Sequence, residues 1–132
     1  MSQANVETAQ RVYDAFERGG IDAVIDFLDP EVIWEDIDAL PGAGTYRGHD
    51  GFRMSAQSFF EAWGQLRLTP QEHIDAGDTV VSAHRWQAVG KESGTPIDML
   101  VWNVMTFRGG NVVRRRAFVD RAKALEAAGL SE

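Results

Sequence analysis

The stretch Val32-Ile33-Trp34-Glu35-Asp36 carries most of the fold information in this chain. Its β-branched and aromatic residues are typical of a strand, which we predict from Val32 to Ile37. Because side chains alternate along a strand, Trp34 and Asp36 share one face and Glu35 lies on the other. Two helical segments precede this strand, and one helix and several long strands follow it.

Three helices are predicted in the N-terminal half from apolar residues at helical spacing. The first helix ends at Gly19-Gly20, and the second carries apolar residues over 24–28 and ends before Pro30. The third helix begins near Asp50, which can cap its N-terminus, and continues to Gly64. The apolar stripe of this third helix consists of Phe52, Ala56, Phe59, Phe60 and Trp63.

The second half of the chain is predicted to be mostly sheet. The expected strands run from Leu66 to Ala76, Thr79 to Val89, Pro96 to Phe107 and Val112 to Val119. Glycine-containing turns join them as successive hairpins. A loop is expected over 40–45, and a short C-terminal helix over 121–128, capped by Asp120 and closed by Gly129. The pattern indicates an α+β class rather than alternating βαβ units.

Composition narrows the classes of partner and site. The 132 residues suit one domain, 1–132, and the net charge of −7 gives no drive toward nucleic acid or an anionic membrane. The chain has no cysteine, so thiol nucleophiles and zinc–thiolate sites are excluded. It has neither a run of about 20 apolar residues nor a signal-like N-terminus. We therefore expect a soluble cytoplasmic protein.

Several segments together resemble a known family over essentially the whole chain. They are Ala15 to Asp22, Trp34 to Asp36, Tyr46 to Phe52, Phe107 to Val113 and Phe118 to Leu125. In order and spacing they resemble SnoaL-like proteins of the nuclear transport factor 2 superfamily, which includes polyketide cyclases, ketosteroid isomerases and limonene epoxide hydrolases. The resemblance implies a cone-shaped, curved mixed or antiparallel sheet wrapped around three N-terminal-half helices, with a short C-terminal helix and a deep apolar pocket.

Alignment with the isomerases and hydrolases implies which strand faces line that pocket. The implied inward residues are Tyr13, Phe16, Trp34, Asp36, Phe59, Trp63, His84, Trp86, Val101, Asn103, Ala117 and Val119. Arg115 shares the inward face of the last strand, but we interpret Arg114-Arg115-Arg116 as a basic cluster that alternation splits between two faces. The outer face would expose Leu100, Trp102, Val104 and Phe118, and the family resemblance implies a homodimer that covers this patch.

Three inward polar residues are the catalytic candidates. Asp36 lies among aromatic rings and corresponds to the proton-abstracting acid of ketosteroid isomerases; alternatively, it is a strand-end residue that bonds the following loop. Asn103 corresponds to an oxyanion donor, or it satisfies a buried neighbour. His84 is expected to pair with Asp36, to act as the acid/base itself, or to be structural.

Other features of the related enzymes are missing from this chain. The catalytic tyrosine of the isomerases falls on Val12, beside Tyr13, and the Asp-Arg-Asp set of the hydrolases falls on Trp86, His84 and Ala117. His49 and His73 are interpreted as solvated side chains, and we expect no metal site.

The sequence thus favours a SnoaL-like enzyme that performs proton-transfer chemistry on a hydrophobic, carbonyl-bearing small molecule. The expected reaction is an isomerisation, an aldol-type cyclisation or a dehydration, and it needs no cofactor. The alternatives are a non-catalytic ligand-binding protein with the same cavity and an assembly protein that uses its sheet face.

Overall fold

The computed structural model describes residues 3–37 and 44–130. Over these residues the chain forms three helices and six strands. In chain order they are α1 (Gln3–Ile25), β1 (Leu28–Glu35), β2 (Thr45–Arg47), α2 (Gly48–Ala62), β3 (Trp63–Ala76), β4 (Thr79–Gly90), β5 (Pro96–Arg108), β6 (Asn111–Phe118) and α3 (Arg121–Ala127). No helix within the described residues is long and apolar enough to cross a membrane.

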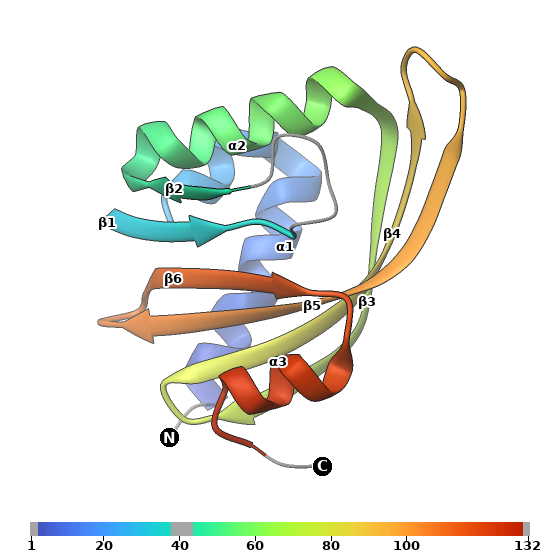
Figure 1. Cartoon of the computed structure of the whole chain (residues 1–132). Helices are drawn as coiled ribbons and strands as arrows, with labels where there is room; N and C mark the ends of the chain where they lie inside the picture. Colours follow the sequence, from blue (N-terminus) through green and yellow to red (C-terminus); the bar gives the residue numbers. More distant parts are fainter. Residues whose placement is uncertain (1–2, 38–43, 131–132) are drawn as a thin grey trace.

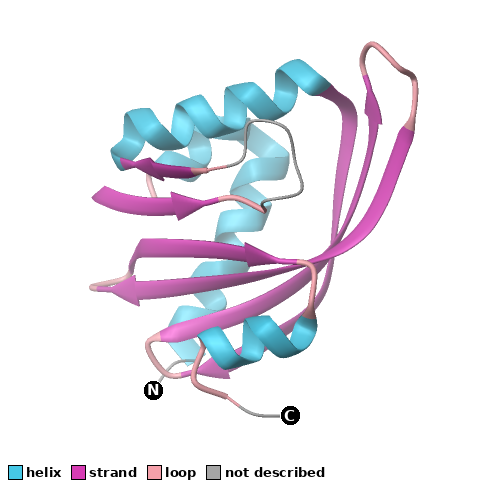
Figure 2. Ribbon diagram, in the orientation of Figure 1, coloured by secondary structure: helices cyan, strands magenta, loops and turns pink. Residues whose placement is uncertain are grey.

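The six strands form one curved, mixed sheet in the order β2-β1-β6-β5-β4-β3, which does not close on itself. All neighbouring strands are antiparallel except β1 and β6, which run parallel. Helix α1 lies behind the sheet and α3 in front of it in Figure 1, and Figure 2 shows how the long strands bend toward the end of α2. This arrangement confirms the predicted α+β fold.

The first two predicted helices are joined in α1, which kinks where Gly20 adopts a positive φ of 68°. This φ lies in a region that glycine reaches without steric cost. The second helical piece ends earlier than predicted, at Ile25, and β1 begins at Leu28 rather than Val32. Leu28 pairs with Val112 of β6, so contact with a strand distant in sequence overrides the local helical spacing.

Two further differences concern short segments beside α2. Thr45, the last residue of the predicted loop, instead begins the edge strand β2, because residues 45–47 pair with β1, including Tyr46 with Trp34. Residues 40–43 of that predicted loop lie outside the described residues. At the other end of α2, Trp63 has extended backbone angles and opens β3, so it does not continue the apolar stripe of the helix.

Helix α3 covers part of the outer face of the sheet. Trp102 and Val104, predicted to be exposed, have only 6% and 3% of their surface accessible and pack with Ala124 and Leu125. Alternation along β5 and the family resemblance together indicated the outer face, but they could not show that a helix packs there. Leu100 remains 42% exposed, and the homodimer through this face stays a prediction.

The predicted cap of α3 is present, since the Asp120 carboxylate accepts hydrogen bonds from the backbone N–H groups of Ala122 and Lys123. We expect Asp120→Ala to lower the free energy of unfolding by about 1 kcal/mol, because both N–H groups lose their acceptor. Asp120→Asn is the control, since its amide oxygen can still accept. Urea unfolding would measure both, and an Asp120→Ala protein as stable as wild type would show that the cap contributes nothing.

Candidate functional site

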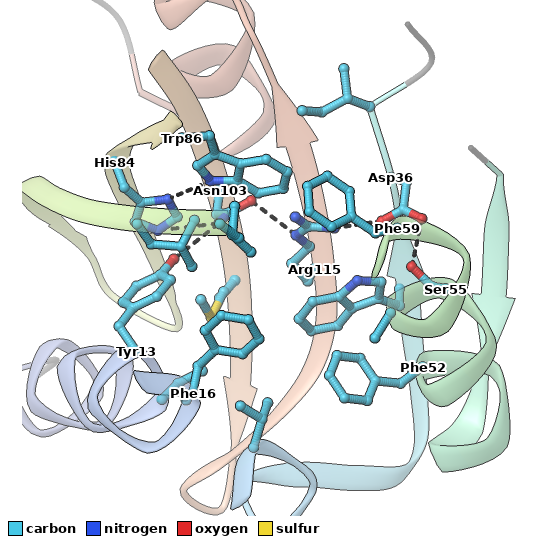
Figure 3. Close-up of a pocket in the computed structure, with 18 of the residues that line it drawn as sticks. Tyr13, Phe16, Asp36, Phe52, Ser55, Phe59, His84, Trp86, Asn103 and Arg115 are labelled. Atoms are coloured by element: carbon cyan, nitrogen blue, oxygen red, sulfur yellow. Dashed lines mark hydrogen bonds and ion pairs between the residues drawn. The ribbon is translucent and has the colours of Figure 1, made fainter. Parts of the chain in front are cut away.

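A cavity of about 120 Å³ lies between the concave face of the sheet and the helices α1 and α2 (Figure 3). An engineered cavity of about 150 Å³ holds benzene, so this volume suits one ring-sized apolar group. The lining residues are mostly aliphatic or aromatic. They are Val12, Tyr13, Phe16, Val24, Trp34, Asp36, Ile37, Phe52, Ser55, Ala56, Phe59, Phe60, Leu66, Leu68, His84, Trp86, Asn103, Met105 and Arg115.

All three predicted catalytic candidates, Asp36, His84 and Asn103, line this one cavity. Of the predicted wall residues, Tyr13, Phe16, Trp34, Phe59 and Trp86 also line it. Their rings pack edge to face in several places, including Phe59 against Trp86 and Trp34 against Phe52.

Four residues predicted as pocket walls do not line the cavity: Trp63, Val101, Ala117 and Val119. Trp63 begins β3, where it pairs with Gly90, and Val101 is fully buried away from the cavity. Ala117 lies beyond the cavity along β6, and Val119 follows the end of that strand and is 55% exposed. Alternation identifies the face of a strand, but not how far along the strand the cavity extends.

Arg115, which we interpreted from the sequence as part of a basic cluster, is the central polar residue of the cavity. It is 3% exposed; its Nε donates to Asn103 Oδ1 and its Nη1 to Asp36 Oδ1, both at 2.9 Å. Its guanidinium carbon lies 4.6 Å from the centre of the Trp34 ring. Burial lowers the pKa of Arg115, and the charge of Asp36 opposes this shift. An inward arginine on a strand that packs against apolar residues was the available sequence signal, because such a cation requires a carboxylate partner.

Two donors hold the Asp36 carboxylate in place. Arg115 contacts one of its oxygens, and the Ser55 hydroxyl on α2 donates to the other at 2.6 Å. The predicted pairing of Asp36 with His84 is not formed, because Arg115 and Asn103 lie between them (Figure 3). The polar groups therefore form a stripe across β1, β6, β5 and β4, opposite the aromatic side chains of the helices.

His84 lies at the far end of this stripe and is fully buried. Its Nδ1 accepts a hydrogen bond from Trp86 Nε1 at 3.1 Å, and its Nε2 lies 3.3 Å from Asn103 Nδ2. Burial lowers the pKa of His84 to about 3, with smaller contributions from Arg115 and His73. The imidazole is therefore neutral near neutral pH, where it can hydrogen-bond a ligand but is a weak base.

Tyr13 is the second neutral group at this end. Its hydroxyl oxygen accepts a hydrogen bond from Asn103 Nδ2 at 3.0 Å, and its ring lies edge-on to His84 with centroids 4.1 Å apart. Burial raises the pKa of Tyr13 to about 12, so the phenol keeps its proton.

The other two histidines are not the solvated side chains that we predicted. His49 Nε2 lies 2.9 Å from the Leu28 carbonyl oxygen, and His73 Nδ1 lies 2.7 Å from Ser82 Oγ. Within residues 3–37 and 44–130, no three histidine or carboxylate side chains are grouped as a metal site would require.

Comparison with known proteins supports the fold. Residues 9–115 match the family model of the SnoaL-like domain. A solved NTF2-like protein of unknown function from Burkholderia pseudomallei superposes with a TM-score of 0.81 at 24% identity, covering 94% of this chain and 96% of that one. TerC, co-crystallised with polyporic acid, gives 0.79 at 24% identity, covering 96% and 99%. A putative SnoaL-like polyketide cyclase from Jannaschia sp. gives 0.76 at 20% identity, covering 99% and 95%. Among curated proteins, none matches the chain.

The low pKa of His84 predicts a loss of stability in acid. Between about pH 6.5 and about pH 3, His84 is protonated in the unfolded chain but neutral in the folded protein. The free energy of unfolding therefore falls as the pH decreases through this window, by about 1.4 kcal/mol per pH unit, and His84 has no effect above it.

Urea unfolding at about pH 7 and about pH 5 measures this effect. Between these conditions we expect wild type to lose about 2 kcal/mol more than His84→Gln. The control variant His49→Gln should follow wild type. Equal losses in wild type and His84→Gln would contradict a neutral, buried His84.

The ion pair of Arg115 with Asp36 predicts coupled effects on stability. Arg115→Met leaves the carboxylate without its charge partner, and Asp36→Asn leaves a buried cation, so each should cost about 3 kcal/mol. The double variant should cost less than the sum by about 1–3 kcal/mol. Urea unfolding of the four proteins measures this coupling. The exposed Arg114–Glu35 pair, at 2.7 Å, is the matched control and should couple by less than about 1 kcal/mol. Additive costs at Arg115 and Asp36 would contradict the ion pair.

Proposed function

Because the chain belongs to the SnoaL-like family, we propose that its cavity binds a compact, apolar, carbonyl-bearing small molecule and performs cofactor-free proton transfer on it. The observation that carries this proposal is the placement of one carboxylate and a stripe of hydrogen-bond donors on one wall of an otherwise apolar cavity. An apolar cavity with a few convergent polar groups is the usual form of a small-molecule site. The co-crystallisation of TerC with polyporic acid supports such a use of this fold.

In this proposal Asp36 is the base that removes a proton next to the substrate carbonyl. Arg115 and Ser55 hold its carboxylate in one orientation, and each oxygen keeps a lone pair beyond these contacts. Arg115 also carries two Nη2 hydrogens that its contacts with Asp36 and Asn103 do not use. These hydrogens are suited to stabilise the negative charge that develops on the carbonyl oxygen, whereas the Asn103 amide hydrogens face Tyr13 and His84.

The alternative is a ligand-binding protein without chemistry. One observation favours it: both Asp36 oxygens already accept hydrogen bonds, and an ion pair with Arg115 stabilises the carboxylate that would have to take up the proton. In that case the donor stripe would only orient a ligand through its acceptor oxygens. The enzyme proposal and this alternative make the same prediction for binding but opposite predictions for proton exchange.

Deuterium exchange into a bound ketone distinguishes the enzyme from the ligand-binding protein. Indan-2-one combines one aromatic ring with a ketone, and its binding can be followed by the fluorescence of Trp34 and Trp86, which line the cavity. We expect wild type to accelerate deuterium incorporation next to the carbonyl in D₂O, measured by proton NMR. In Asp36→Asn this acceleration should be about 100-fold smaller than in wild type, because the amide cannot accept the proton.

The adjacent Glu35 supplies the matched control. Its side chain lies on the other face of β1 and contacts Arg114, so Glu35→Gln should exchange at the wild-type rate. Binding of indan-2-one with equal exchange rates in wild type and Asp36→Asn would reject the base and leave the ligand-binding alternative.

A further inference from the structure

A second row of exchangeable protons begins at Tyr13 and leads away from the Asp36 end of the cavity. Ser82 is fully buried on β4, and its side-chain hydroxyl acts as a hydrogen-bond donor that lowers the pKa of the Tyr13 hydroxyl. On the side away from the cavity, Ser82 Oγ lies 2.7 Å from Nδ1 of His73 on β3. Tyr13 lines the cavity, whereas His73 is partly exposed. The three side chains therefore form a row of neighbouring exchangeable groups that leads from the cavity to a partly exposed side chain on β3.

An irregularity in β3 creates this path. Pro70 pairs with His84, but the next pair along the strands is Glu72 with Ala83, so one extra residue is inserted at position 71. Such a bulge reverses the alternation that follows it. It turns His73 inward, opposite Ser82, and brings its ring centroid to 6.0 Å from that of Tyr13. Without the bulge, His73 would face outward, which agrees with the solvated side chain that we predicted.

We infer that His73, Ser82 and Tyr13 form a proton relay that delivers a proton from solvent to a substrate oxygen in the cavity. The use of the relay in catalysis rests on the proposed function, whereas its existence as a path does not. Tyr13 is the acid in contact with the substrate, and Ser82 and His73 supply its proton. Asn103 already donates to the Tyr13 oxygen, so the phenolic hydrogen is left to point elsewhere.

The transfer balances without any other reactant. As the substrate oxyanion takes the Tyr13 proton, the Ser82 hydroxyl proton moves to the Tyr13 oxygen and the His73 Nδ1 proton moves to Ser82 Oγ. Water supplies one proton to Nε2 of His73, so the imidazole ends neutral as the other tautomer. Burial of Tyr13 and of His73 keeps each of them neutral between turnovers, since it raises the pKa of the former and lowers that of the latter.

This relay distinguishes between the proposed reaction classes. An isomerisation can return the proton held by Asp36 to a second carbon, so it needs no supply from solvent. An aldol-type addition leaves a new alkoxide, which must take up a proton. Asp36 is 19% exposed and can release its own proton to water. The relay therefore favours an aldol-type reaction, in which a proton enters at Tyr13 and another leaves at Asp36.

Hydrogen exchange at the Tyr13 hydroxyl tests the relay without any substrate. In a mixture of H₂O and D₂O, the ¹³Cζ signal of labelled tyrosine splits when hydroxyl exchange is slow and merges when exchange is fast. Tyr13→Phe assigns the signal. We expect fast exchange in wild type and a rate about 100-fold lower in His73→Gln. Glutamine can still hydrogen-bond Ser82 but cannot pass a proton, so a structural role of His73 would leave the rate unchanged.

Ser82→Ala, which removes the middle group, should slow exchange to the same extent, and His49→Gln, outside the path, should match wild type. Slow exchange already in wild type, or fast exchange in both His73→Gln and Ser82→Ala, would overturn the relay. These outcomes are independent of Asp36. A relay found by NMR together with no effect of Asp36→Asn on indan-2-one exchange would reject the proposed function alone.

Discussion

The buried guanidinium of Arg115 is the constraint on which the rest of the site depends. A cation with 3% of its surface exposed, in a cavity lined mainly by apolar groups, is tolerated only with a carboxylate partner and acceptors for its N–H groups. Asp36 supplies the negative charge, and the side-chain carbonyl oxygen of Asn103 accepts a hydrogen bond from Arg115 Nε. Because that oxygen is used by Arg115, the amide nitrogen of Asn103 must face Tyr13 and His84. The orientation of one side chain thus follows from the charge of another.

As a result, the two ends of the site differ in charge: one end carries charged side chains and the other carries neutral ones. At one end, the charged side chains of Asp36 and Arg115 form an ion pair whose net charge is zero. At the other end, burial keeps His84 as a neutral imidazole and Tyr13 as a neutral phenol. Charged chemistry is therefore confined to the Asp36 end, and the other end offers hydrogen bonds and a protonated hydroxyl. A substrate whose carbon lies near the carboxylate and whose oxygen lies near the phenol would use both.

The same arrangement distinguishes this chain from the enzymes that its sequence resembles. Val12 stands where ketosteroid isomerases carry their catalytic tyrosine, and Trp86, His84 and Ala117 stand where epoxide hydrolases carry Asp, Arg and Asp. The arginine of this cavity comes instead from β6, beside Asp36. Fold similarity below 25% identity shows a common scaffold, and the polar groups placed on it define what each member can do.

Local patterns were reliable where one short-range rule decides the outcome. Helical spacing located α2, and a single acid marked the cap of α3. Alternation grouped the strand residues by face, and the family resemblance indicated the face on which Asp36, His84 and Asn103 line the cavity. These patterns failed where a residue or element distant in sequence determines the local structure or the burial of a side chain. Leu28 joined a strand because β6 was available, and Trp102 is buried because α3 covers it.

By itself the sequence determined the order of elements, the faces of the strands and the composition of an aromatic cavity, since periodicity and turn chemistry are local properties of the chain. Only the tertiary structure decided the role of Arg115, because this role depends on Asp36, which lies 79 residues away, directly after the parallel strand β1. Only the tertiary structure turned His73 inward as well, because a bulge is defined by the register between two strands and not by either strand alone.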